Sequence, residues 1–390
     1  MIDSNTIYAD YQATTPVDPR VLTEMTPFWD NSFGNPHSSD HVVGWHAEKA
    51  VQEAASAIAS MIGSDGNEIV FTSGATEANN LAILGMARHH ANTRRRILIS
   101  TIEHKCVLGA ARVMSSYEGF TVETISVDSE GFLDLDELEE RLDDSVLLVS
   151  IMAVNNEVGT IQDIPSISQL VRSCGALFHC DAAQAPCAME LESLATYADL
   201  ISLSAHKMYG PQGIGALYIG REIHDRIEPL LYGGGQQEGL RSGTVPLPLC
   251  VGMAAASEII VAEGCEERKR IARQRDMFIA LLQETGLTID VNGPTSDHRH
   301  PGNANIRFDG YDARDIIASL QPKLAASTGA ACSSGIPEPS HVLRAIGLTA
   351  DQSEASIRFS FGRFTTDDEI EQAANLVGTA ISNLAIDHAS

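Results

Sequence analysis

The chain has 390 residues, of which 44% are hydrophobic, and a formal net charge of -26 at pH 7. This length allows a large core in two or three structural units, and the composition excludes wholesale disorder. The negative charge argues against direct binding of nucleic acid or of anionic membrane surfaces. Residues 1–8 lack the basic and apolar parts of a signal peptide.

The seven cysteines have no paired spacing, and no Cys-x-x-Cys motif occurs. This usage fits a reducing compartment better than a disulfide framework, and the absence of a Cys-x-x-Cys motif argues against a structural zinc site. The longest apolar run, Val146–Val154, is too short to cross a bilayer. We therefore expect a cytoplasmic protein with no membrane segment and no metal site.

Short β-rich runs alternate with helical patterns through the first two-thirds of the chain. Helical patterns occur, for example, at Thr76–His90 and Leu135–Leu142. Continuous apolar strands separated by helices predict an α/β fold with a mainly parallel sheet covered on both faces. The seven expected strands are Glu68–Thr72, Arg96–Thr101, Thr121–Val127, Val146–Met152, Ala176–Cys180, Leu200–Ser204 and Gly215–Ile219.

A long polar helix from about Ser257 to Glu284 leads out of this region. Shorter elements follow it, at Ala304–Phe308, Ala313–Leu320 and Ser356–Phe361, and they predict a smaller α+β domain. We expect residues 16–258 to form the large domain. Residues 1–15 and 259–390 would form the small one.

Two of the expected strands end in side chains that suit one cofactor. Leu200–Ser204 leads to Lys207, and Ala176–Cys180 leads to Asp181. Ligands of parallel sheets lie at the carboxyl ends of strands, so these two side chains should meet. Pyridoxal phosphate (PLP) needs an amine for a Schiff base and an acid facing its pyridine nitrogen. The paired strand ends therefore predict a PLP site.

The segment Phe71–Glu77 reads as a strand that passes through a glycine turn into a helix. Backbone N–H groups and the helix dipole make such a turn an anion site. Plain capping by Ser73 or Thr76 explains the segment equally well. Beside a cofactor lysine it would cradle a phosphate, with Ser204 and His206 as further hydrogen-bonding groups.

His104 follows another strand, where an imidazole could stack on a flat cofactor ring or move protons near neutral pH. Taken alone, one of thirteen histidines is more simply a polar loop residue. Arg358 lies in an alternating strand that could aim its guanidinium at a substrate carboxylate. A surface ion pair is an equally good interpretation of Arg358.

Small residues and glycines surround Cys332 in the segment Ser327–Gly335. Such residues cannot pack a firm core, so the segment predicts a mobile loop that displays a thiol. The thiol reacts as a thiolate, which requires a nearby cation or helix N-terminus. The sequence does not identify that group.

Together these segments resemble the cysteine desulfurases of the NifS/IscS-like group, within the class V aminotransferase superfamily of fold-type I PLP enzymes. The cysteine loop is the discriminating part, because in this group the cysteine carries a persulfide, and Cys332 matches it in setting and spacing. The similarity spans nearly the whole chain, at Tyr8–Asp18, Gly34–His37, Val154–Gly159, Glu338–Leu343 and Arg358–Thr366.

The resemblance implies three catalytic residues, namely Lys207 as the Schiff-base lysine, His104 as the ring-stacking histidine and Cys332 as the persulfide carrier. Asp181 would pair with the pyridine nitrogen and Gln184 with the ring hydroxyl. The residues implied to hold PLP are Ala75, Thr76, Asn156, Asp181, Gln184, Ser204, His206, Lys207 and Thr244. Those implied to hold the substrate are Asn35, Asn156 and Arg358.

Thr244 matches a residue that reaches the phosphate of a neighbouring subunit, which implies a homodimer with shared active sites. The implied reaction converts L-cysteine to L-alanine and passes the sulfur from Cys332 to an acceptor, most simply a protein. Iron–sulfur assembly, tRNA thiolation and DNA phosphorothioation all stay open as the destination. Alternatives are a selenocysteine lyase, another class V aminotransferase-type enzyme, or a non-catalytic docking protein of a sulfur pathway.

Overall fold

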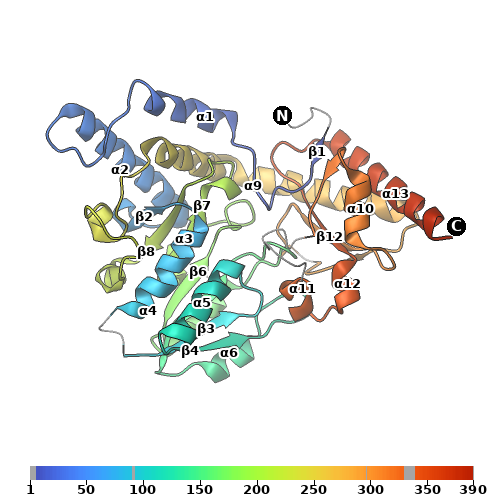
Figure 1. Cartoon of the computed structure of the whole chain (residues 1–390), viewed down its shortest axis with the longest axis horizontal. Coiled ribbons are helices and arrows are strands. Elements are labelled where there is room, and N and C mark those ends of the chain that lie inside the picture. The colour runs from blue at the N-terminus through green and yellow to red at the C-terminus, as the bar shows by residue number, and fades with distance from the viewer. Residues whose placement is uncertain (1–5, 90–92, 296, 329–338, 390) are drawn as a thin grey trace.

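The computed structural model describes residues 6–89, 93–295, 297–328 and 339–389. A large sheet occupies one end of the molecule and a smaller α+β unit the other (Figure 1). The strands of the large sheet are β2 (Ile69–Thr72), β3 (Arg96–Ser100), β4 (Thr121–Ile125), β5 (Val146–Met152), β6 (Leu177–Asp181), β7 (Leu200–Ser204) and β8 (Gly215–Ile219).

The seven strands follow the order β2-β8-β7-β6-β5-β3-β4. All pairings are parallel except those of β8, which is antiparallel to both β2 and β7. The prediction of a mainly parallel seven-stranded sheet is confirmed. Every residue of β5 is buried, which explains why this strand is apolar without alternation.

Helices cover both faces of the large sheet. One face packs against α2 (Val42–Ile62), α7 (Ile164–Ser173) and the first part of α9 (Leu247–Glu284). The other packs against α3 (Ala75–Asn80), the π-helical turn η3 (Leu81–Gly85), α4 (Met86–Arg88) and α5 (Lys105–Tyr117). The single helix predicted for Thr76–His90 therefore contains a π-helical stretch.

The remaining helices of this part are α1 (Pro19–Met25), α6 (Leu135–Arg141) and α8 (Leu194–Tyr197), with short 3-10 turns η1 (Thr26–Trp29), η2 (Gly66–Glu68), η4 (Ala205–Lys207), η5 (Arg221–Arg226) and η6 (Gln237–Gly239).

The smaller unit is built around a three-stranded antiparallel sheet of order β12-β10-β9. The first strand of the chain, β1 (Ile7–Tyr8), pairs in parallel with β11, so the N-terminal segment lies within the C-terminal part of the fold. The elements of this unit are β9 (Asp290–Val291), β10 (Asn303–Arg307), β11 (Leu324–Ala325), β12 (Ser356–Ser360), α10 (Ala313–Leu320), α11 (His341–Ala345), α12 (Ala350–Glu354) and α13 (Asp367–Ala389).

The helix α9 connects the two units, and Figure 1 shows it running from the large sheet to a position beside α13. Its first part contributes Met253 and Ile260 to the large core, and its second part contributes Ile271 and Phe278 to the small one. It begins well before the predicted start at Ser257, because its first turns are apolar and buried rather than polar. The expected division at residue 258 falls inside this continuous helix.

By length and composition, α9 is also the one helix among the described residues that could cross a membrane. However, 56% of its most apolar window is buried inside the protein. It packs along α2, α1 and α13. A core helix of a folded domain passes the same test, so this feature is weak evidence for a membrane segment.

Candidate active site

A cavity of about 520 Å³ lies at the carboxyl ends of the parallel strands. Its walls come from both units of the fold and from the N-terminal segment. The residues predicted from the sequence that line it are Ala75, Thr76, His104, Asn156, Asp181, Gln184, Ser204, His206, Lys207 and Arg358. Segments more than 280 residues apart in the chain thus meet at one site.

Lys207 reaches the cavity from η4, the turn that follows β7. Its Nζ donates hydrogen bonds to the carbonyl oxygens of Gln12 (2.6 Å) and Ala13 (2.7 Å). The amine is therefore held by backbone oxygens of the N-terminal segment. These two contacts were not predicted, because the sequence around Gln12 and Ala13 does not indicate where in the fold this N-terminal segment lies.

Asp181 ends β6, and its side chain is buried. One oxygen, Oδ1, accepts from the backbone N–H of Ala183 at 3.0 Å. The other, Oδ2, accepts from Nδ2 of Asn79 at 2.7 Å. Two donors therefore fix the orientation of the carboxylate. Asn79 was missed in the sequence, where it reads as an ordinary polar residue of a helix.

The glycine turn after β2 has the form of an anion cradle. Gly74 is the N-cap of α3, with φ of 147°, a conformation that favours glycine, and no side chain caps the helix. The alternative that Ser73 or Thr76 caps this helix is therefore wrong. The N–H groups of the first helical turn have no intrahelical partner and are available to an anion.

A charged pair braces this turn from outside. The Glu77 carboxylate accepts from the backbone N–H of Ser73 (2.7 Å) and from Nε of Arg241 (2.8 Å). Burial alone would raise the pKa of Glu77, but the hydrogen bonds from Arg241 and Ser73 outweigh it and lower that pKa. Glu77 is thus ionised and paired at neutral pH.

The two histidines of the cavity are held in different ways. His206 has its Nδ1 3.1 Å from Oγ1 of Thr14, and burial together with the charge of Lys207 lowers its pKa to about 4. It is therefore neutral at physiological pH. His104 caps α5, where its Nδ1 accepts from the backbone N–H of Cys106 at 3.2 Å and lies 2.9 Å from the Cys106 sulfur.

Arg358 lies in the middle of β12, and its side chain is buried. Its Nη1 donates to the carbonyl oxygen of Asn156 at 2.7 Å, and its Nη2 donates to Oδ1 of Asp10 at 2.5 Å. The interpretation of Arg358 as a surface ion pair is wrong, since the guanidinium faces the cavity from the interior.

Two of the predicted residues within the described part of the chain, Thr244 and Asn35, do not line this cavity, and Thr244 is exposed. Cys332 lies outside the described residues. Asn35 is also exposed, and its Oδ1 accepts from the backbone N–H of His37 at 3.0 Å. Gln184 does line the cavity, where its Nε2 donates to the carbonyl oxygen of Gln12 at 2.8 Å. The roles assigned to these residues stay predictions.

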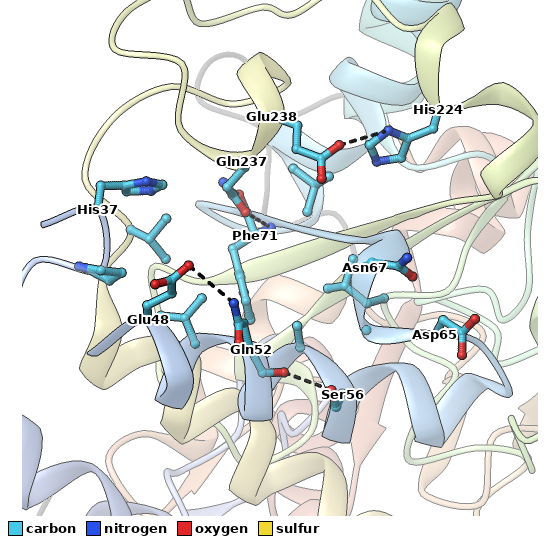
Figure 2. A pocket seen from close by; sticks show the side chains of 17 residues that line it. His37, Glu48, Gln52, Ser56, Asp65, Asn67, Phe71, His224, Gln237 and Glu238 are labelled. Atoms are coloured by element: carbon cyan, nitrogen blue, oxygen red, sulfur yellow. Dashed lines mark hydrogen bonds and ion pairs between the residues drawn. The ribbon is translucent and has the colours of Figure 1, made fainter. Parts of the chain in front are cut away.

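His37 belongs to a second, more open pocket of about 670 Å³, which Figure 2 shows between α2 and the segment around Gln237. There the Gln237 side chain is fixed by two bonds to the backbone of Phe71, one accepted at 2.7 Å and one donated at 3.0 Å. Among the described residues, no cluster of three or more histidine, cysteine or acidic side chains is arranged to hold a metal ion.

Comparison with known proteins places this arrangement in a family. A family model described as aminotransferase class-V matches residues 7–373. The chain is 45% identical over 378 residues to the cysteine desulfurase IscS of Rickettsia prowazekii (strain Madrid E), an alignment that covers 97% of this chain and 92% of the relative. The chain belongs to the cysteine desulfurases of the class V aminotransferase family.

Solved structures of the family share this fold. A NifS-like protein superposes with a TM-score of 0.89 at 34% sequence identity, covering 97% of this chain and 99% of the other. The protein SspA in complex with cysteine gives a TM-score of 0.81 at 35% identity, covering 93% and 100%. The whole of this desulfurase fold, including both units around the cavity, is therefore common to these proteins.

A buried acid stands beside the cavity of this desulfurase and was not predicted. Oε1 of Glu103 accepts from Oγ of Ser100 (2.6 Å) and from the backbone N–H of Met152 (2.9 Å). Its Oε2 is buried and has no hydrogen-bond partner among the described residues. Burial raises the pKa of Glu103 to about 8, so this carboxyl holds a proton at neutral pH.

We expect this acid to make stability depend on pH. Between the ordinary glutamate pKa near 4.5 and the folded pKa of about 8, the folded chain keeps a proton that the unfolded chain has lost. The free energy of unfolding should therefore fall as pH rises through that window, by about 1.4 kcal/mol per pH unit from this group. The Glu103→Gln variant should lack this contribution. Urea unfolding at a series of pH values would test it, and parallel curves for the two proteins would contradict it.

Proposed function

We propose that this protein is a PLP-dependent L-cysteine desulfurase that releases L-alanine and keeps the sulfur as a persulfide on Cys332. The observation that carries the proposal is the convergence of Lys207, Asp181, His104 and Arg358 on one cavity at the strand ends. An amine, a fixed carboxylate, an imidazole and a guanidinium are the groups that an amino acid bound to PLP would use.

The residues of the cavity fit PLP. Lys207 supplies the amine for the aldehyde, and Asp181 supplies a doubly hydrogen-bonded carboxylate for the pyridine nitrogen. The uncapped turn at Gly74 supplies N–H groups for the phosphate, and Ser204 and His206 line the same wall. Bound there, PLP would withdraw electrons from the substrate and make its Cα proton acidic.

The chain's own residues would then perform the remaining tasks. Lys207 would be the base that takes the Cα proton, since the carbonyls of Gln12 and Ala13 hold its Nζ at the cavity. His104 can return a proton before alanine leaves. Arg358, anchored on the Asn156 carbonyl, can bind the substrate carboxylate.

Sulfur removal would fall to Cys332. Its thiolate attacks the substrate sulfur, so that an S–S bond forms while the C–S bond breaks and leaves its electron pair with the carbon fragment. Protonation of that fragment gives L-alanine, and the charges balance without an oxidant. The step requires the two sulfurs to approach to about 3–3.5 Å.

The described ends of the cysteine segment support this role. On one side, Ser327 exchanges two backbone hydrogen bonds with Arg358, at 2.7 Å and 3.2 Å. On the other, Ser340 donates to Oε2 of Glu157 at 2.5 Å, next to the cavity residue Asn156. The two described ends of the segment that carries Cys332 are therefore both joined to residues beside the cavity.

The assay that tests this function is incubation of the PLP-loaded protein with L-cysteine and a thiol reductant, followed by quantification of alanine and sulfide. Equal amounts of both products are expected. A parallel incubation with L-selenocysteine, in which that substrate alone reacts, would favour a selenocysteine lyase. A protein that takes up no PLP and makes neither product would instead fit a docking role.

We also propose a cytoplasmic enzyme that passes its sulfur to a protein acceptor. The six cysteines within the described residues are all free, which fits a reducing compartment. The net charge of -26 argues against direct docking on nucleic acid.

A homodimer is the assembly that we propose. Large apolar side chains are exposed on two segments near the second pocket, and such patches mark interaction surfaces. They belong to the region from η1 into α2 and to the loop after η5, and they include Trp29, Phe33, Val43, Trp45, Leu231 and Tyr232. Thr244 is exposed in the same loop region, as a residue that serves the neighbouring subunit would be.

Replacing Tyr232 by glutamate should weaken the dimer. This ring is 78% exposed in the single chain, and a charge at a central aromatic contact costs about 2 kcal/mol or more, or roughly thirtyfold in the dimer dissociation constant. Tyr117→Glu is the matched control, since Tyr117 is 83% exposed on α5, away from the patch. Sedimentation velocity should show dissociation in the first variant alone. A wild type that sediments as a monomer would refute the assembly.

A further inference from the structure

The guanidinium of Arg358 has one unused edge. The bonds to the Asn156 carbonyl and to Asp10 use one hydrogen of Nη1 and one hydrogen of Nη2. Its Nε is buried and has no hydrogen-bond partner within the described part of the chain. Nε and the second Nη2 hydrogen form the fork that receives a carboxylate with two parallel bonds. Because Arg358 also lines the cavity, we take this edge as the place of the substrate carboxylate, reached when the groups that now cover Nε move and with Asp10 kept on Nη2.

Asp10 is held beside this guanidinium by its backbone. It forms a parallel bridge with Ser360, whose N–H donates to the Ala9 carbonyl at 2.7 Å and whose carbonyl accepts from Tyr11 at 3.1 Å. Ser360 and Arg358 are two residues apart on β12, so their side chains leave the same face of the strand. The position of Asp10 thus depends on strand pairing as well as on the ion pair.

This arrangement has two electrostatic consequences. A buried guanidinium without a counter-charge is costly, and Asp10 supplies that charge before substrate arrives. When substrate binds, its carboxylate and Asp10 become like charges on one cation. Asp10 must therefore oppose binding of any amino acid whose carboxylate sits on Arg358. L-Alanine has the same carboxylate and amine as L-cysteine, so the opposition applies equally to the product.

We propose that Asp10 is a charge-balancing residue that keeps carboxylate capture by Arg358 weak enough for L-alanine to leave. The inference rests on the proposed function, because it takes L-alanine as the product and Arg358 as its anchor. Asp10 acts through Arg358 and is a positioning residue rather than a catalytic one.

The Asp10→Asn variant separates charge from position, because the asparagine oxygen can still accept from Nη2. We expect this variant, loaded with PLP, to bind L-alanine about tenfold more tightly by isothermal titration calorimetry, the effect of one neighbouring charge. The KM for L-cysteine should fall by a similar factor, and kcat should fall because the product leaves more slowly. The Asp10→Glu variant, which keeps the charge, should bind L-alanine within threefold of wild type, about the scatter of such comparisons.

A second buried pair provides the control. Asp18 contacts Arg363 at 2.8 Å, and both side chains are buried away from the cavity. Asp18→Asn should lower the melting temperature and leave the affinity for L-alanine unchanged.

Unchanged or weaker alanine binding by Asp10→Asn would overturn the proposal. A wild type that makes no L-alanine from L-cysteine would instead refute the function, whatever the two affinities show.

Discussion

Replacing Cys332 by serine should abolish sulfide release and reduce alanine formation by about a thousandfold or more, because the nucleophile that takes the sulfur is lost. Binding of PLP should be unaffected, since the residues that fit the cofactor lie on the sheet ends and not in the cysteine segment. The melting temperature should also stay unchanged, because the neighbours of Cys332 are small residues that cannot pack a core. Alanine quantification and the visible spectrum of bound PLP measure the two sides of this prediction.

Cys265 is the matched control for that experiment. It is an exposed cysteine of α9, and Cys265→Ser should retain full activity. If the Cys332→Ser protein still released sulfide at the wild-type rate, the thiol would have no part in the reaction. The protein would then be closer to the class V enzymes that work without a loop cysteine.

Replacing Lys207 by alanine should remove both the covalent attachment of PLP and the base for the Cα proton. General acid–base contributions alone are about 10²–10⁴-fold, so we expect alanine formation to fall by at least about a thousandfold. The protein should still fold, because Lys207 is only partly buried and its partners are backbone carbonyls. Borohydride should fix PLP to the wild type and not to this variant.

Lys269→Ala serves as the control, since Lys269 is an exposed lysine of α9 that pairs with the nearby Glu266. It should behave as wild type in both assays. Borohydride labelling of the Lys207→Ala protein at another lysine, with activity retained, would show that Lys207 was wrongly assigned.

The general form of the fold follows from sequence pattern. Seven β-rich runs predicted the seven strands of the large sheet, and Val146–Met152, Leu200–Ser204 and Gly215–Ile219 agree in their bounds with the structure. A buried parallel strand is apolar on both faces, so its pattern is strong. Because parallel strands end at one edge, the same pattern also placed Lys207 and Asp181 at a common cavity.

Tertiary contacts were the part that pattern could not supply. Gln12 and Ala13 hold Lys207 although 194 or more residues separate them, and Asp10 reaches Arg358 across 348. No local propensity encodes such a distance. Glu103 is similar, because one of its two hydrogen bonds comes from the distant Met152, whereas a glutamate in isolation predicts exposure.

The glycine turn shows where a local rule was misleading. Ser73 and Thr76 are both good capping residues, yet Gly74 takes the N-cap position and leaves the first helical turn uncapped. Ser73 gives its N–H to Glu77 instead. A helix without a side-chain cap at its N-terminus forgoes the stability that the cap would add, and its first N–H groups stay available to an anion. This combination is expected of a binding site.

The most direct test is mass spectrometry of the peptide that contains Cys332, after brief incubation of the PLP-loaded enzyme with L-cysteine in the absence of reductant. The proposed function predicts a mass increase of one sulfur atom on Cys332, reversed by a thiol reductant, with one alanine released for each modified chain. Alanine release with an unmodified Cys332, or with the added sulfur on another cysteine, would contradict it.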